Sequence, residues 1–259
     1  MKPILYIQTD LFSEDENDPN ASRYAASPYF ETRKIDDSDV CFGKIGSPRE
    51  RNSGFRASLD YAHRIGRKFE FTDATKWLPR FRELCVSDDA YFTDMHNVLG
   101  SLWQDSGKSQ FVRPTSGFKT FSGNCYNYQS FKNESEFLKQ NKNIHPRDVL
   151  CMVAQPRIIN YEWRLIYIDG KYISGSHYMT NGKLSSYLSV PMEALTLANH
   201  IAAQDYFANN FAFVLDIAMV EGKFRLIEVN AFETASFYKA DLNAVYKAYA
   251  ASISQQTLN

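Results

Sequence analysis

Two apolar runs in the last quarter of the sequence predict a β-hairpin in which each strand carries an acid. Phe213 to Ile217 and Phe224 to Val229 are rich in the β-branched and aromatic residues of strands, and Glu221-Gly222-Lys223 between them is typical of a tight turn. Asp216 and Glu228 interrupt these runs. Because charged residues are rarely buried without a partner, the two acids need an explanation.

Alternation of side chains along a strand places Glu228 and Asn230 on one face. If the hairpin pairs about Gly222, Asp216 lies nearly opposite Glu228, and three oxygen-bearing side chains converge. Such ligands suit a hard cation such as Mg²⁺, which keeps several waters and takes few protein ligands plus substrate phosphates. In the alternative interpretation, Asp216 lies at a strand end, Glu228 faces solvent on an edge strand and Asn230 begins a turn. The hairpin alone favours neither interpretation.

The same reading predicts further elements along the chain. A second hairpin runs from Tyr161 to Tyr178 about Asp169-Gly170, a pair that favours a type I′ turn. Shorter strands are predicted at Ile4 to Ile7, Val40 to Ile45, Phe111 to Pro114 and Val149 to Gln155. Helices are predicted at Ala57 to Ile65, Ser87 to Trp103, Asn133 to Asn141, Ser189 to Phe207 and from Asp241 towards Ile253.

The basic stretch from Arg49 to Arg67 could contact phosphate or RNA, but we favour the solvated face of a helix for its arginines. Beyond it, Gly107-Lys108-Ser109 has the composition of a linker, and from Gln110 the chain becomes rich in strands. We therefore predict an N-terminal domain over 1–108 and a second domain over 109–259.

A loop from Thr115 to Gly123 is a candidate for phosphate binding. It holds two glycines, several hydroxyl residues and Lys119, so its backbone N–H groups could approach phosphate oxygens while Arg113 adds a fork of donors. It lacks the terminal Gly-Lys-Ser/Thr of the helix-opening phosphate loop, and such loops are common. The strand that ends at Gln155 could receive a nucleotide base, although a plain core strand is the commoner case.

Three polar residues of the second hairpin are further candidates. Glu162 and Arg164 share a face; they could form a surface salt bridge of little value, or Arg164 could neutralise charge on a transferred phosphoryl group if buried beside phosphate. His177 ranks second, because a lone histidine is more often structural than catalytic.

Composition and charge limit the classes of partner that the chain can bind. A formal charge of −1 and a pI near 6.5 give no electrostatic footprint for nucleic acid or an anionic membrane. Both values are compatible with a local basic groove. Lys2-Pro3 leads directly into a strand, no apolar stretch reaches membrane-spanning length, and four scattered cysteines show no metal-ligand spacing. We expect a cytoplasmic protein.

The order of these parts resembles the ATP-grasp superfamily. The matching stretches are FVRPTSGFKTFSG, VLCMVAQP, YEWRLIYIDGKYISGSHY and FVLDIAM followed by FRLIEVNAF, and they lie within Phe111 to Ala250. Together they are far more specific than any one of them. The resemblance implies an α+β, ATP-grasp fold in which two α+β subdomains grip ATP, here with a reduced N-terminal α/β domain.

The resemblance also implies roles for individual residues. It places Mg²⁺ on Asp216, Glu228 and Asn230, adenine against Val153 to Gln155, phosphates under the loop around Lys119, and Arg164 on phosphate and the developing intermediate. Arg113 stands where many members carry an ATP-binding lysine. The nucleotide-binding candidates are thus Arg113, Lys119, Val153, Ala154, Gln155, Glu162 and Arg164, and the catalytic candidates are Arg164, Lys119 and His177.

The activity implied by the resemblance is an ATP- and Mg²⁺-dependent ligase that joins a carboxylate to an amine through an acylphosphate. The acceptor would be an amino acid, a peptide or a protein end, and the chain could form a homodimer. Two other classes stay open: an ATP-grasp phosphotransferase acting on a small molecule or a nucleic-acid end, and a non-catalytic nucleotide-binding module.

Overall fold

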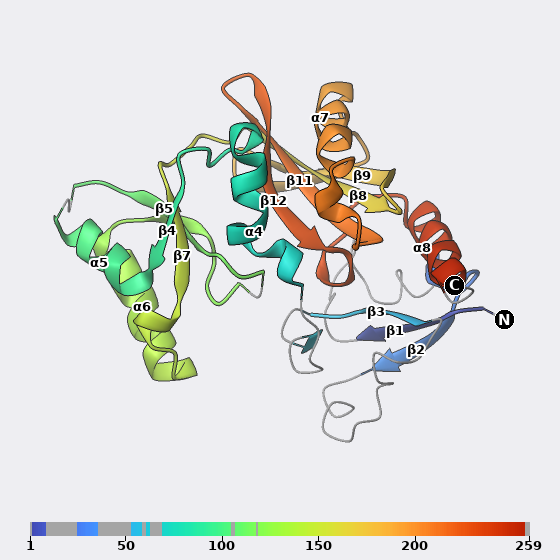
Figure 1. The fold of residues 1–259 in the computed structure, drawn as a ribbon, viewed down its shortest axis with the longest axis horizontal. Coiled ribbons are helices and arrows are strands. Elements are labelled where there is room, and N and C mark those ends of the chain that lie inside the picture. The colour runs from blue at the N-terminus through green and yellow to red at the C-terminus, as the bar shows by residue number, and fades with distance from the viewer. Residues whose placement is uncertain are drawn as a thin grey trace. The chain divides into compact units, whose positions relative to one another are not determined.

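The computed structural model describes most of the chain and divides it into two compact units (Figure 1). The described residues are 2–8, 25–35, 53–58, 61–62, 69–104, 107–117 and 119–256. One unit combines Met1–Lys68 with Ile159–Asn259, and the other is Phe69–Ile158. The predicted strand at Val40 to Ile45 lies outside the described residues. The predicted boundary at residue 108 rests on the linker-like composition of Gly107-Lys108-Ser109, and it stays a prediction.

A five-stranded antiparallel sheet forms the centre of the first unit, in the order β10-β9-β8-β11-β12. Its strands are β8 (Tyr161–Ile168), β9 (Lys171–Thr180), β10 (Lys183–Tyr187), β11 (Ala212–Val220) and β12 (Lys223–Ala231). Both predicted hairpins are confirmed. Asp169 and Gly170 have φ of 50° and 71°, and Glu221 and Gly222 have φ of 51° and 74°, as two-residue hairpin turns require. The edge strand β10 was not predicted.

Alternation along these strands presents two apolar faces to two helices. Tyr167 and Phe213 lie on the face towards α7 (Met192–Ala202), and the Tyr167 hydroxyl donates to Asn199 Oδ1 at 2.8 Å. Ile166 and Val214 lie on the other face and pack in one cluster with α8 (Leu242–Gln256). The predicted cap of the last helix is confirmed, because Asp241 Oδ1 accepts from the Ala244 N–H at 3.0 Å.

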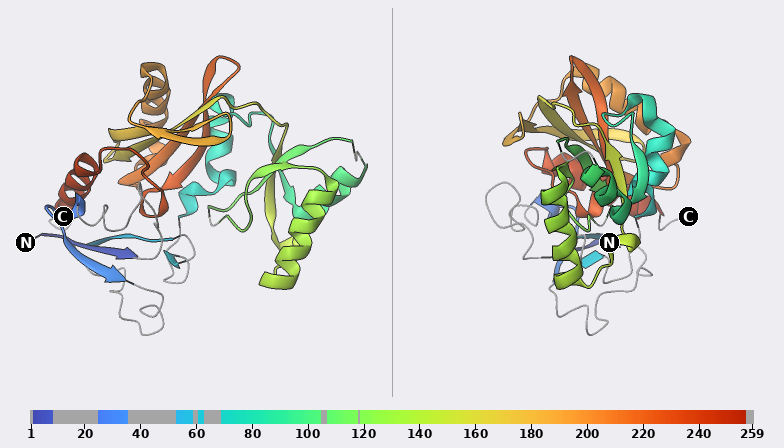
Figure 2. Two further views of the ribbon diagram at one scale, coloured as in Figure 1. Left: turned by 180° about the vertical axis from the view of Figure 1, so that it is seen from behind. Right: turned by 90° about the vertical axis from the view of Figure 1, so that its left-hand side faces the viewer.

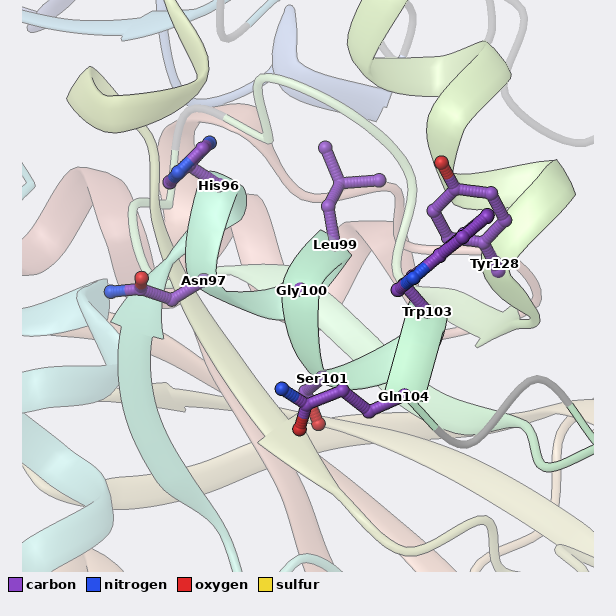
Figure 3. Close-up of a pocket in the computed structure, with 8 residues that line it drawn as sticks. All are labelled: His96, Asn97, Leu99, Gly100, Ser101, Trp103, Gln104 and Tyr128. Atoms are coloured by element: carbon purple, nitrogen blue, oxygen red, sulfur yellow. The ribbon is translucent and has the colours of Figure 1, made fainter.

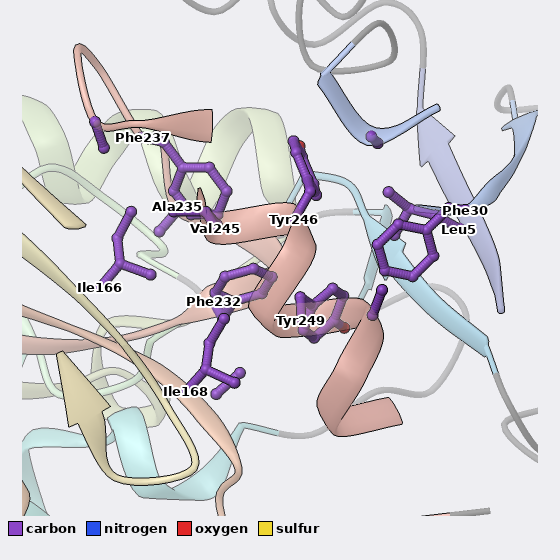
Figure 4. Packing of buried hydrophobic residues seen from close by; sticks show 14 of the residues in the cluster. Leu5, Phe30, Ile166, Ile168, Phe232, Ala235, Phe237, Val245, Tyr246 and Tyr249 are labelled. Atoms are coloured by element: carbon purple, nitrogen blue, oxygen red, sulfur yellow. The ribbon is translucent and has the colours of Figure 1, made fainter. Parts of the chain in front are cut away.

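A second, parallel sheet packs on the far side of α8 in the same unit. Its order is β2-β1-β3, with β1 (Ile4–Gln8), β2 (Glu31–Ile35) and β3 (Ser53–Arg56). Leu5 joins Tyr246 and Tyr249 of α8 in a cluster that continues to the large sheet (Figure 4). The favoured interpretation of the basic stretch is wrong for Arg56, which is a strand residue and only 2% exposed. The main-chain carbonyls that it binds, described below, explain why an arginine is buried there.

Gly54 of β3 lies where this sheet meets α8. A Cβ at Gly54 would lie 2.7 Å from Tyr249 Cε1 and 2.9 Å from Ile253 Cδ1, both in buried side chains. We expect Gly54→Ala to lower the free energy of unfolding by about 1–3 kcal/mol through overpacking. The matched control is Gly100→Ala, because a Cβ at Gly100 meets nothing within 4 Å and removing a helical glycine should add about 0.5–1 kcal/mol. Urea denaturation of both variants measures the difference, and equal stability would contradict the close approach.

The second unit holds a four-stranded antiparallel sheet, in the order β4-β7-β5-β6, and two of its three helices, α5 and α6, pack on this sheet (Figure 2). Its strands are β4 (Tyr91–Asp94), β5 (Gln110–Pro114), β6 (Asn124–Tyr126) and β7 (Leu150–Ala154). Its helices are α4 (Ala74–Phe81), α5 (Met95–Gln104) and α6 (Tyr128–Lys142). Single 3₁₀ turns occur in both units, at η1 (Glu70–Thr72), η2 (Arg82–Leu84), η3 (Pro146–Asp148), η4 (Asp205–Phe207) and η5 (Phe232–Thr234).

Three predicted helices differ in their bounds, and the one predicted over Ser189 to Phe207 spans only Met192–Ala202. The helix predicted from Ser87 begins at Met95, because Tyr91–Asp94 pairs with β7 and Asp94 Oδ1 caps the helix by accepting from the Asn97 N–H at 2.8 Å. The helix predicted from Asn133 begins at Tyr128 after a capping box made by Asn127 and Ser130. The short strands predicted near residues 111 and 150 are confirmed. None of the described helices is both long and apolar enough to cross a membrane.

Candidate active site

The two acids of the β11–β12 hairpin lie directly opposite each other. Asp216 pairs with Glu228, and Asn230 lies two residues further along β12, opposite Val214. Paired residues of antiparallel strands point to the same face, so all three side chains project from the face that packs on α8 further along the strands. The convergence that the alternation predicts is confirmed.

A single β-bulge produces this register. From the turn, Val220 pairs with Lys223 and Ile217 with Leu226, and the register then shifts so that Asp216 pairs with Glu228. Ile227 is the extra residue. Without the bulge, the register would continue unchanged and Asp216 would pair with Ile227. Glu228 would then point to the opposite face of the sheet from Asp216, because a one-residue slip reverses the face of every side chain.

Arg164 of β8 binds Asp216 across the neighbouring strand pair. Its Nε and Nη2 donate to the two Asp216 carboxylate oxygens at 2.8 and 2.7 Å, a bidentate ion pair, and its Nη1 donates to the Ser236 carbonyl at 3.1 Å. Asp216 is 1% exposed and Arg164 8% exposed. Asn230 Nδ2 lies 3.0 Å from Asp216 Oδ2 and 3.0 Å from Glu228 Oε1, so the three groups share one small volume.

Two tyrosines complete this cluster. Tyr178 and Tyr238 stack with ring centroids 4.9 Å apart, and the Arg164 guanidinium lies 5.4 and 5.2 Å from their centroids. The Tyr178 hydroxyl donates to Glu162 Oε2. Tyr178 was not predicted as a site residue. It lies on the Arg164 face because Ser176, two residues earlier in β9, pairs with Arg164. The register then shifts from Trp163 opposite His177 to Glu162 opposite Met179, which makes Tyr178 the extra residue of a bulge that has no sequence signature.

Among the described residues of this cluster, negative charge exceeds positive charge. The three carboxylates of Glu162, Asp216 and Glu228 and the guanidinium of Arg164 have a formal sum of −2. Burial alone would lower the pKa of Arg164, but the charge and hydrogen bonds of Asp216 outweigh it and the pKa is raised. Burial raises the pKa of Glu162 above its ordinary value of 4.5, and its bond from Tyr178 offsets only part of this rise. Arg164 is therefore permanently charged, whereas Glu162 takes up a proton more readily than an exposed acid.

This raised pKa gives the protein a measurable pH dependence. The folded protein holds the Glu162 proton more tightly than the unfolded chain, so the stability it contributes is fully present below pH 4.5 and is lost as the pH rises through the folded value. We expect Glu162→Gln to flatten this fall in the free energy of unfolding, measured by urea denaturation without Mg²⁺ between pH 4.5 and 7.5. Glu221→Gln, which removes a carboxylate at the exposed hairpin turn, is the matched control. Parallel curves for wild type and Glu162→Gln would contradict the burial argument.

His177 lies on the other face of the sheet. It pairs with Trp163 and packs on its ring at 5.6 Å, stacks on Tyr187 at 4.3 Å, and is fully buried. Its Nδ1 lies 2.6 Å from the Ser185 carbonyl and its Nε2 3.2 Å from Thr180 Oγ1. The structure thus does not bring His177 to Arg164, and these contacts describe a packing residue.

The remaining predicted nucleotide-binding residues belong to the second unit. Arg113, on β5, is buried, and its Nε donates to the Pro114 carbonyl at 3.3 Å. Lys119 is exposed, has a left-handed φ of 47°, and donates its N–H to the Ser116 carbonyl. Val153 and Ala154 are buried in β7, and the strand ends where the Gln155 N–H donates to Asp89 Oδ2 at 3.0 Å. No signal in the sequence pointed to this contact, because Asp89 fell at the start of the helix predicted from Ser87.

The chemistry of the donor set can be compared with the needs of Mg²⁺. Across the described ranges, no group of three His, Cys, Asp or Glu is arranged to hold a metal ion. A site on the hairpin would therefore use two carboxylates and the amide of Asn230. Hard oxygen ligands, few in number and beside excess negative charge, fit an ion that completes its shell with water and phosphate.

A pocket of about 610 Å³ lies on α5 and involves none of the predicted site residues (Figure 3). Its walls include Trp103, which is 65% exposed and meets Tyr128 edge-on at 4.9 Å. It is thus a surface feature of the second unit.

Comparisons with known proteins identify the family of this chain. The model of the ATP-grasp domain, R2K clade family 2, matches residues 91–248, which is more than half of the chain. Among curated proteins, none matches the sequence.

Similar solved structures share the fold at low identity. D-cycloserine synthetase DcsG matches with a TM-score of 0.66 and 14% identity over 96% of this chain and 99% of that one. D-alanine–D-alanine ligase from Bacillus anthracis matches with a TM-score of 0.57 and 12% identity, covering 100% and 98% of the two chains. ATP-grasp ligase PsnB, complexed with a minimal precursor, gives a TM-score of 0.57 and 12% identity over 97% and 99%. The fold is the α+β, ATP-grasp fold, and the chain belongs to the ATP-grasp family, R2K clade family 2.

Proposed function

We propose that this protein is an ATP- and Mg²⁺-dependent ligase that joins a carboxylate to an amine through an acylphosphate. The observation that carries the proposal is the buried Arg164–Asp216 ion pair beside Glu228 and Asn230, in a chain of the ATP-grasp family. Similar structures include a D-alanine–D-alanine ligase and an ATP-grasp ligase complexed with a minimal precursor, and the substrate class that we propose is an amino acid or a peptide.

In the proposed reaction, a carboxylate oxygen attacks the γ-phosphorus of ATP and the bond to ADP breaks. The amine nitrogen then attacks the acyl carbon, loses its proton to solvent or a base, and phosphate leaves with the carboxylate oxygen. Asp216, Glu228 and Asn230 would hold Mg²⁺, which when bound offsets negative charge on the phosphate oxygens. Val153 to Gln155 would contact adenine, and Lys119 and Arg113 the phosphates. No enzyme nucleophile is needed.

Arg164 has a defined part in this scheme. A guanidinium has five N–H donors, and three of them bind Asp216 and Ser236 within the described part of the chain, so two remain for a phosphoryl or acylphosphate oxygen. Asp216 fixes the plane of the guanidinium, so the charge is positioned before the reaction begins. This pre-positioning is the electrostatic term that phosphoryl transfer requires.

An isotope experiment tests the proposal. Purified protein is given ATP, Mg²⁺ and pools of ¹⁸O-labelled amino acids or short peptides, and the released phosphate is analysed by mass spectrometry. The expected result is released phosphate that carries one ¹⁸O atom from the labelled carboxylate. This phosphate should appear only when an amine acceptor is present, and the labelled compound can itself be that acceptor. A phosphorylated product that persists would instead identify a phosphotransferase, AMP and pyrophosphate would identify adenylation, and ATP binding without turnover would identify a binding module.

A further inference from the structure

The loop from Phe232 to Tyr238, called the 232–238 loop below, connects the site to α8. It follows directly on β12, which carries Glu228 and Asn230, and it opens with the 3₁₀ turn η5. Its carbonyl groups have no sheet partners of their own, so other groups must satisfy them. Two buried arginines, Arg56 and Arg164, do so from different elements.

The first half of the 232–238 loop is bound by the end of β3. Arg56 Nη1 donates to the Phe232 carbonyl and Nη2 to the Ala235 carbonyl at 2.6 Å, while the Ala57 N–H donates to the Glu233 carbonyl at 3.0 Å. The ring of Phe237 lies 3.8 Å from the Arg56 guanidinium carbon. An apolar side chain of similar length could fill this buried position without the cost of desolvating a charge. What arginine adds is therefore its N–H donors, which bind the loop carbonyls.

The second half of the 232–238 loop meets the site. The Ser236 carbonyl accepts from Arg164, and the Tyr238 ring stacks on Tyr178. Tyr238 has φ of 50°, a left-handed conformation that is costly for a bulky residue and persists only where the surroundings hold it. The strained residue is thus the one that contacts both Tyr178 and Arg164.

We propose that Arg56 is a positioning residue for the reaction proposed above: by binding the carbonyls of the 232–238 loop, it holds Ser236 and Tyr238 against Arg164. The proposal rests on the proposed function, since it concerns the same site. It gives the N-terminal parallel sheet a part in catalysis that does not require contact with substrate. Without Arg56, the loop would leave Arg164 with one fixed partner, Asp216, in place of two.

The test compares Arg56→Met and Arg56→Lys with a matched control, Arg33→Met. Arg33 lies in the same three-stranded sheet, but it is exposed and its guanidinium binds Glu31 and Tyr6. Hydrogen exchange measured by mass spectrometry should be faster by about tenfold or more in peptides that span the 232–238 loop, and unchanged in β8. We expect kcat to fall about 10- to 100-fold in Arg56→Met and less in Arg56→Lys, the range that a misplaced catalytic group produces.

Calorimetric titration with Mg·ATP separates positioning from a general loss of structure. The expected stoichiometry and affinity stay within twofold of wild type in all variants, so that a lower kcat cannot reflect a smaller folded fraction. If Arg56→Met does not fold, Arg56→Lys, which keeps the charge and a long stem, carries the test. Unchanged exchange in the loop, or faster exchange with wild-type kcat in both variants, would overturn the proposal. If wild type turns over no ATP, the proposed function fails, and the exchange data still accept or reject the tie between Arg56 and the loop.

Discussion

Replacing Arg164 with methionine is expected to lower kcat/KM at least about 1,000-fold and the free energy of unfolding by about 3–5 kcal/mol. The loss of stability follows because Asp216, 1% exposed, would lose the bidentate partner of its buried charge. The loss of activity follows because the guanidinium that binds Asp216 would no longer face the phosphoryl group. Urea denaturation and phosphate release measure the two effects separately.

The double variant Arg164→Met with Asp216→Asn provides the matched control for this prediction. Removing both charges leaves no uncompensated ion, so most of the lost stability should return, whereas activity should stay at the level of the single variant. A single variant as stable as wild type would show that the ion pair is not buried in solution. Recovery of activity in the double variant would remove Arg164 from the proposed mechanism.

Replacing Glu228 with glutamine is expected to abolish the Mg²⁺ dependence of ATP binding and to lower turnover at least about 100-fold. The amide keeps the size of the side chain and an oxygen, but it removes one of the two carboxylate charges that the proposed ligand set supplies. Calorimetric titration with ATP, with and without Mg²⁺, checks the first effect directly.

Glu221→Gln is the matched control, because it removes the same charge from the same hairpin at the exposed turn. It should bind Mg·ATP like wild type. If Glu228→Gln also keeps the wild-type Mg²⁺ dependence while folded, the hairpin is not the metal site, and the excess negative charge around Arg164 has another role.

The sequence predicts the central hairpin and its pairing of Asp216 with Glu228, but for a different reason from the one in the structure. Pairing about Gly222 assumes a three-residue turn, whereas the chain makes a two-residue turn at Glu221 and Gly222 and inserts Ile227 as a bulge. Both arrangements give the same register beyond the bulge. Hydrophobic alternation fixes which face is buried, but it cannot show where the extra residue is placed.

Other parts of the site could not be predicted, because tertiary contacts determine them. Arg56 lies in a run of arginines that resembles a solvated helix face, and its burial depends on contacts with carbonyls of a loop 176 residues away. Tyr91 to Asp94 has a helical pattern, yet pairing with β7 makes it a strand. Local propensity is weak compared with such long-range pairing.

The discontinuous first unit has a consequence for biosynthesis. The apolar face of β1 is covered by α8, and the second unit lies between these two elements in the sequence. During translation the second unit, a continuous segment, can fold as soon as it leaves the ribosome, whereas Leu5 and Ile7 must wait until α8 has been made. The strand β1 is therefore made before the second unit but is buried after it, and chains that stop short of α8 would expose β1 to chaperones and proteases.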